Sequence, residues 1–85
     1  RQLNSVLARD PQSSEAYVML ADAYLFAEDY EKSEDSANRA LTIHPKDARA
    51  YLFRADARRF QQRYAEALGD YLTYLRINDF RAPLY

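Results

Sequence analysis

The stretch SEAYVMLADAYLFAEDY, residues 14–30, decides the fold of this chain, because its pattern returns as ARAYLFRADARRFQQRY, residues 48–64. Shifting the 85-residue sequence against itself by 34 positions gives nine identities in one period. Roughly two or three would arise by chance at ordinary composition. The first members of the nine identical pairs are Ala16, Tyr17, Ala21, Asp22, Ala23, Phe26, Tyr30, Leu41 and Ile43. A period of this length indicates a stack of similar supersecondary units.

Each period is predicted to form two helices. Apolar residues recur three and four positions apart, and the alternation typical of strands is absent. Pro11 and Pro45 lie one period apart, and each is followed by a good helix N-cap at the second position after it, Ser13 or Asp47. We therefore expect an all-α chain, with helices over residues 14–27, 31–43, 48–61 and 65–78.

The pattern resembles the tetratricopeptide repeat, a family of antiparallel helix pairs that stack into a superhelix. In the first period the matching residues are Tyr17, Leu20, Ala21, Tyr24, Tyr30, Ala37, Ala40 and Pro45. In the second they are Tyr51, Ala55, Tyr64, Ala67, Tyr71 and Tyr74. The resemblance implies a helical-hairpin solenoid of about two and a half repeats. Its parts are the second helix of a preceding partial repeat (1–13), two full repeats (14–47 and 48–81) and the start of a further repeat (82–85).

Several residues depart from the family pattern. Glu28 and Gln62 stand in the turns that normally carry glycine, and a left-handed conformation there would cost about 1–2 kcal/mol. The only glycine, Gly69, falls inside a predicted helix, where it costs about 1 kcal/mol relative to alanine. We expect Gly69 to allow a close approach between helices. Ser33 replaces the usual alanine, and Asp79 replaces the closing proline.

Two arginines stand where the first repeat has apolar residues. Arg54 and Arg58 take the positions of a leucine and a tyrosine on the packed face. An arginine on such a face must extend its head to water or find an anion. The candidate anions are Asp70 in the partner helix and Glu34 and Asp35 in the preceding helix. The alternative is that both arginines simply reach water.

The first helix of each pair has two apolar sides. The side bearing Tyr17, Leu20, Ala21 and Tyr24 is expected to pack within the helix pair. Stacking would align the opposite sides of successive first helices along a concave wall, and exposed apolar surface of that kind usually marks an interaction site. The expected groove residues are Val18, Met19, Asp22, Leu25, Phe26, Arg49, Leu52, Phe53, Asp56, Arg59 and Phe60.

The expected function is a protein–protein interaction scaffold. The apolar groove residues Met19, Phe26, Phe53 and Phe60 are expected to form an array that holds a peptide or helix of a partner. Arg49 and Arg59 beside the array would clamp an acidic group of that partner. The alternative is an architectural spacer or self-association module whose groove is filled from within. One subclass of the family grips chaperone tails through a carboxylate clamp. The matching positions here carry Val18, Asp22 and Phe53, which cannot supply its donors.

Other function classes have little support in the sequence. The net charge is −1 and the arginines scatter around their helix, so no nucleic-acid partner is expected. No apolar run approaches the roughly 20 residues of a membrane span. We expect no enzyme, no cofactor and no metal site, because the lone His44 sits in a turn and no catalytic motif is present. Unpaired leucines at both ends of the stack favour further repeats or a homo-oligomer.

Overall fold

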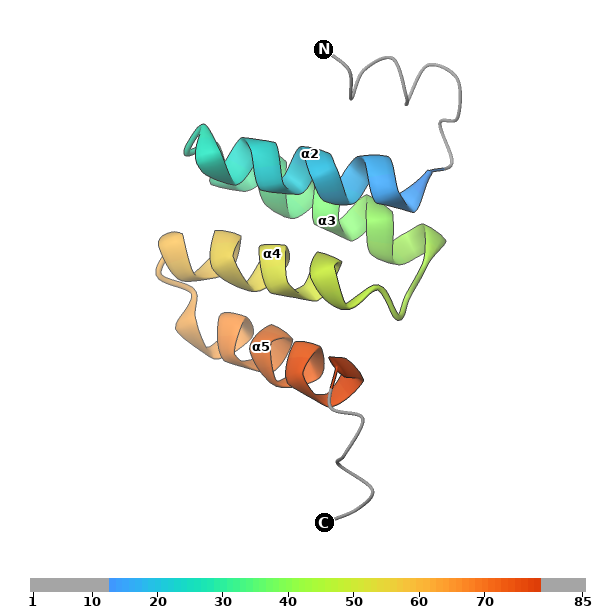
Figure 1. The fold of residues 1–85 in the computed structure, drawn as a ribbon. Helices are drawn as coiled ribbons and strands as arrows, with labels where there is room; N and C mark the ends of the chain where they lie inside the picture. The colour runs from blue at the N-terminus through green and yellow to red at the C-terminus, as the bar shows by residue number, and fades with distance from the viewer. Residues whose placement is uncertain (1–12, 79–85) are drawn as a thin grey trace.

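The structure is a computed structural model that describes residues 13–78. Within that range the chain forms helices and no strand, and the helices pair into two hairpins that stack on one another (Figure 1). The predicted helix boundaries are confirmed to within one residue. The partial repeats expected at the two ends lie outside the described residues, Ser13 excepted. The helices are α2 (Ser14–Phe26), α3 (Tyr30–Ile43), α4 (Ala48–Phe60) and α5 (Tyr64–Asn78).

The two hairpin turns have the same geometry. Glu28 has a φ of 62° and Gln62 a φ of 65°, so both adopt the left-handed conformation that the turn requires. In the first turn the backbone N–H of Asp29 donates to the carbonyl of Tyr24 at 2.9 Å, and the equivalent bond closes the second turn at 2.8 Å. This is the Schellman arrangement, which usually has glycine at the left-handed residue. Each hairpin therefore carries the expected cost of about 1–2 kcal/mol.

The predicted N-caps are confirmed. The Ser13 hydroxyl accepts a hydrogen bond from the backbone N–H of Ala16 at 3.2 Å. The Asp47 carboxylate accepts one from the backbone N–H of Arg49 at 3.1 Å. Side chains of this kind satisfy N–H groups that have no partner within the helix. The two caps occupy equivalent positions of successive periods, but Ser13 bonds the N–H three residues on and Asp47 the N–H two residues on.

The core is built almost entirely from alanine. A small residue on facing helices lets their backbones approach closely, and this explains how four short helices pack with few large side chains. Val18, Ala40 and Ala50 meet where α2, α3 and α4 come together. The buried apolar residues of the described range are Ala16, Val18, Ala21, Ala37, Ala40, Ala50, Ala55, Ala57 and Ala67.

Ser33 fits this core despite its hydroxyl. It is fully buried, and its Oγ donates to the carbonyl oxygen of Ala21 at 2.7 Å. A buried hydroxyl is tolerated when it makes such a bond. The serine therefore ties α3 to α2 at a position where the family usually has alanine.

Gly69 does not have the role expected of it. Among the described residues, a Cβ built on Gly69 meets no atom of another helix within 4 Å, so none of those helices approaches closely there. We predict that Gly69→Ala raises the free energy of unfolding by about 1 kcal/mol, because it removes the helix penalty of glycine without a clash. Urea unfolding followed by circular dichroism measures this, with Ala65→Gly on the exposed side of α5 as the reverse control. A loss of stability in Gly69→Ala would contradict it.

Candidate functional site

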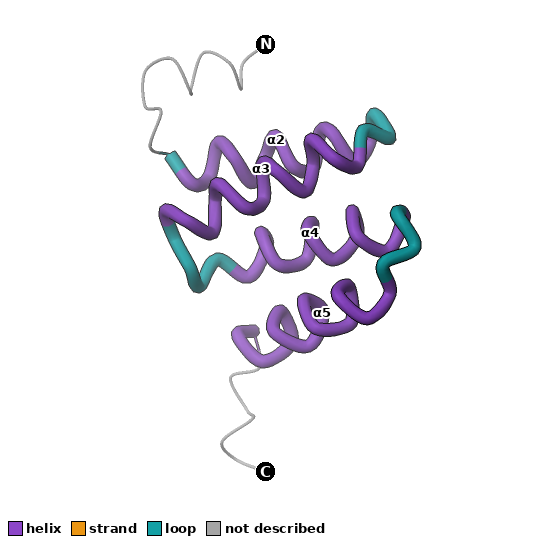
Figure 2. Tube along the Cα trace, turned by 180° about the vertical axis from the view of Figure 1, so that it is seen from behind, coloured by secondary structure: helices purple, strands orange, loops and turns teal. Residues whose placement is uncertain are grey.

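The first helices of the two hairpins lie side by side. Helices α2 and α4 contact each other directly, while α3 packs against both. Helix α2 lies in front of α3 in Figure 1, and Figure 2 shows the same pair from behind. The exposed sides of α2 and α4 therefore form one surface, which we call the α2/α4 wall.

Most of the predicted groove residues contribute to the α2/α4 wall. Met19, Asp22 and Phe26 are exposed on α2, and Arg49, Arg59 and Phe60 are exposed on α4. The half-buried members of the set are Leu25, Leu52, Phe53 and Asp56. The wall thus combines exposed apolar side chains with charges of both signs.

Val18 is a core residue, and its assignment to the groove is wrong. It is only 1% exposed and packs with Ala40 and Ala50, because its position faces the meeting point of three helices. Phe53 packs against the same cluster from α4 and is half-buried. Its ring therefore serves the core as well as the wall, and substitution of Phe53 would change stability along with any binding.

The expected continuous apolar array does not form, because Phe26 and Phe60 have different surroundings. Phe60 stacks on Tyr30 of the preceding hairpin, with ring centroids 4.9 Å apart and planes inclined by 13°. The Arg59 guanidinium lies 4.4 Å from the Phe60 ring centroid. Phe26 is 94% exposed. The two residues are equivalent in sequence, but only Phe60 has a described hairpin in front of it.

A polar cluster organises the α4 side of the wall. The Tyr71 hydroxyl donates to the Asp56 carboxylate, and Arg59 Nε donates to the Tyr71 oxygen at 3.0 Å. Burial and the bond to Asp56 raise the pKa of Tyr71, so this hydroxyl keeps its proton. In the first hairpin the position of Tyr71 is taken by Ala37, which has no hydroxyl. Asp22, the equivalent of Asp56, is exposed.

Arg54 and Arg58 find their anion in Asp70, as one of the sequence alternatives proposed. Arg54 donates to both Asp70 oxygens at 3.0 and 2.7 Å, and Arg58 donates at 2.9 Å. The arginine side chains are only 20% and 18% exposed, so the alternative that both simply reach water is wrong. Asp35 takes no part, because it pairs with Arg39 at 3.2 Å.

Glu34 completes this network from the preceding hairpin. Its carboxylate accepts hydrogen bonds from Arg58 at 2.9 Å, Gln61 at 3.1 Å and Arg63 at 2.8 Å. Burial raises the pKa of Glu34, but the hydrogen bonds from Arg58, Arg63 and Gln61 outweigh burial and lower it below its ordinary value. One carboxylate from α3 thus holds three donors from α4 and the following turn.

Because the folded pKa of Glu34 lies below its ordinary 4.5, its contribution to stability is complete above that pH. The contribution is lost as the pH falls below 4.5 through the folded value. We predict that the free energy of unfolding falls more steeply between about pH 5 and about pH 3 in the unmodified chain than in Glu34→Gln. Urea titrations at several pH values measure this. Parallel pH profiles for the two proteins would contradict it.

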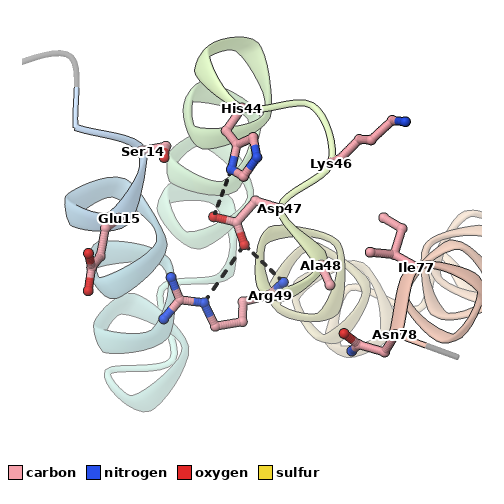
Figure 3. Close-up of a pocket in the computed structure, with 9 residues that line it drawn as sticks. All are labelled: Ser14, Glu15, His44, Lys46, Asp47, Ala48, Arg49, Ile77 and Asn78. Atoms are coloured by element: carbon pink, nitrogen blue, oxygen red, sulfur yellow. Dashed lines mark hydrogen bonds and ion pairs between the residues drawn. The ribbon is translucent and has the colours of Figure 1, made fainter. Parts of the chain in front are cut away.

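A hollow of about 540 Å³ opens where the N-terminal ends of α2 and α4 approach the end of α5 (Figure 3). Asp47 lies between His44 and Arg49, 3.9 Å from His44 Nδ1 and 3.7 Å from Arg49 Nε, and it also caps α4. Lys46 points away from it in Figure 3. Asp47 therefore already interacts with residues close to it in the sequence. His44 is exposed in the turn, as predicted.

A family model described as "Tetratricopeptide repeat" matches residues 1–57. The chain belongs to the tetratricopeptide repeat family. No curated protein matches it in sequence. The family model ends inside α4, and the internal repeat of the sequence extends the same pattern through α5.

Tetratricopeptide repeats generally mediate protein–protein interactions, and the family is a non-catalytic scaffold family. In the described part of the chain no helix is both long and apolar enough to cross a bilayer. Residues 13–78 also contain no group of three or more acidic, histidine or cysteine side chains placed to hold a metal ion.

Sequence reasoning missed the polar cluster of Asp56, Arg59 and Tyr71. The only signal available was that a tyrosine in the second repeat replaces the small Ala37 of the first. That substitution distinguishes the two halves of the wall. In the α4 half, the Asp56 carboxylate accepts a hydrogen bond from the Tyr71 hydroxyl. In the α2 half, the equivalent Asp22 is exposed.

Proposed function

We propose that the α2/α4 wall is a groove that binds a short peptide or helix of a partner protein. The observation that carries this proposal is Phe26, a large apolar side chain that is 94% exposed on α2, the helix that also carries the exposed Met19. Exposed apolar side chains that gather on one surface are typical of interaction sites. The family's general role in protein–protein interaction supports the same conclusion.

The chemistry of the wall suggests the kind of segment it would hold. Burying a side chain the size of Phe26 contributes about 1.5–3 kcal/mol before the costs of ordering the partner. Asp22 would attract a basic group, and the exposed Arg49 would attract an acidic one. We therefore expect an apolar segment that carries charges of both signs, one toward each helix.

The test begins with selection of binding peptides from a random library on the intact 85-residue chain. Hydrogen exchange of the chain with a selected peptide should then show protection in α2 and α4. Phe26→Ala is expected to weaken that peptide by about 10- to 100-fold, the equivalent of the burial lost. Leu68→Ala is the matched control, because it also shortens an exposed apolar residue but lies on α5.

Two outcomes would reject the wall as the binding surface. One is equal loss of affinity in Phe26→Ala and Leu68→Ala. The other is protection confined to α3 and α5. If no peptide is selected at all, the alternative is favoured, in which these repeats act as an architectural spacer or self-association module with no partner segment in the groove.

A further inference from the structure

An arginine in the α4 half of the wall contacts an acid and an aromatic ring at the same time. Arg59 Nη2 lies 3.6 Å from Asp56 Oδ1, and Arg59 Cζ lies 4.4 Å from the centroid of the Phe60 ring. Arg59 Nε also donates to the Tyr71 hydroxyl, which in turn donates to Asp56. Asp56 and Phe60 lie one helical turn apart on the same face of α4, so one guanidinium can contact both.

The same acid and ring recur on α2, one period earlier. Asp22 takes the position of Asp56, and Phe26 takes that of Phe60. Asp22 is exposed, whereas the side chain of Asp56 is 26% exposed. Among residues 13–78, no lysine, arginine or histidine lies within ion-pair distance of Asp22. The pair on α2 is therefore a copy of the pair on α4 without its cation.

Two substitutions account for the missing cation and the missing hydroxyl. Leu25 stands where α4 has Arg59, and Ala37 stands where α5 has Tyr71. Leucine and alanine side chains have no N–H or O–H group, so neither can donate a hydrogen bond to the acid. The sequence of α2 also contains no lysine or arginine. A cation for this acid and ring must come from another part of the chain or from a partner.

We propose that Asp22 and Phe26 form a site for the guanidinium of an arginine on the partner segment. This inference rests on the proposed function, because both residues belong to the α2/α4 wall. The guanidinium lies over the Phe26 ring and donates hydrogen bonds to the Asp22 carboxylate. It thus makes the two contacts that Arg59 makes within the chain.

The geometry favours arginine over lysine. A guanidinium is planar, so it can lie flat on an aromatic ring while the N–H groups at its edge donate to a carboxylate. A lysine ammonium is a compact and strongly hydrated charge, and it loses part of its hydration when it contacts a ring. Asp22 also lacks the hydroxyl that Asp56 receives from Tyr71, so more of its acceptor positions are open to the N–H groups of the guanidinium.

The first test compares two peptide libraries screened on the intact 85-residue chain. The libraries are identical except that one fixes arginine and the other fixes lysine at the central position. Binders should come mainly from the arginine library. Replacing the fixed arginine of a selected peptide with lysine should weaken binding about 10-fold.

The outcomes of this screen separate the inference from the proposed function. Equal yields from the two libraries, with no loss of affinity on replacement by lysine, would overturn the arginine site. The groove itself would still stand if Phe26→Ala weakened those peptides and Leu68→Ala did not. If neither library yields a binder, both the arginine site and the groove are rejected.

The second test locates the acid that the arginine contacts. Asp22→Asn should weaken a selected arginine peptide about 10-fold and leave the same peptide with methionine in place of arginine unaffected. Glu31→Gln is the matched control, because it removes the same charge from an exposed position on α3. Equal losses in Asp22→Asn and Glu31→Gln would overturn the proposal, since they would reflect only the overall charge.

Urea unfolding of the free chain gives the last measurement. Asp22→Asn should leave the urea midpoint unchanged, because the carboxylate waits for a partner that is absent. A lower midpoint would show that a cation of the chain already occupies Asp22, and the proposal would be overturned.

Discussion

Replacing Asp70 with alanine is expected to lower the free energy of unfolding by about 3–5 kcal/mol. Asp70 is 5% exposed and receives hydrogen bonds from two arginines that are themselves largely buried. Its loss leaves two guanidinium groups in the junction with fewer acceptors, and this uncompensated charge is the source of the cost. For a domain of this size the loss removes much of the total stability.

Thermal and urea unfolding measure the effect, with Asp35→Ala as the control. Asp35 also pairs with an arginine, but the pair is exposed on the surface of α3. Removal of such a pair changes stability by about 0.5 kcal/mol or less. Similar losses in the two variants would show that burial of the Asp70 network does not matter to the fold.

The second large effect is a recovery of stability when the partners of Asp70 are replaced together with it. The triple variant Arg54→Leu, Arg58→Tyr and Asp70→Ser gives the second hairpin the residues that the first has at the same positions. Replacing the partners of a buried ion pair together is often neutral or stabilising, whereas removal of one partner is costly. Glu34 stays in the triple variant and keeps its donors Gln61 and Arg63. We expect the triple variant to regain most of the roughly 3–5 kcal/mol lost in Asp70→Ala.

Urea unfolding of the unmodified chain, Asp70→Ala and the triple variant, run side by side, measures this recovery. The double variant that keeps Arg54 should remain unstable, because this guanidinium loses its acid Asp70, whereas Arg58 would still have Glu34. If the triple variant is as unstable as Asp70→Ala, the network contributes more than mutual neutralisation and the apolar face does not fit the junction.

The fold could be predicted because the same repeat pattern occurs twice in the sequence. The prolines, the caps Ser13 and Asp47 and the left-handed turn positions Glu28 and Gln62 each occur at matching places. Such local signals agree with one another, and the structure follows them to within a residue. The role of Gly69 was not predictable, because the sequence does not say which side of a helix faces open space.

The candidate site was less predictable for a physical reason. A helical wheel places Val18 beside the groove, but the angle at which α4 crosses α2 decides whether it faces a ligand or the core. That angle depends on how small residues such as Ala50 pack against α2. The same applies to Phe60, whose partner Tyr30 belongs to the other hairpin. A helical wheel describes one helix at a time, so it cannot predict contacts between repeats.

The alanine core has a consequence for how the chain can vary. Between residues 13 and 78, eight of the nine buried apolar residues are alanine. Every replacement of an alanine except glycine adds volume, and added volume in a filled interior costs about 1–3 kcal/mol. Glycine costs about 1 kcal/mol through helix propensity. Natural drift and combinatorial libraries should therefore leave these eight sites almost unchanged and accumulate diversity at the half-buried tyrosines and leucines around them.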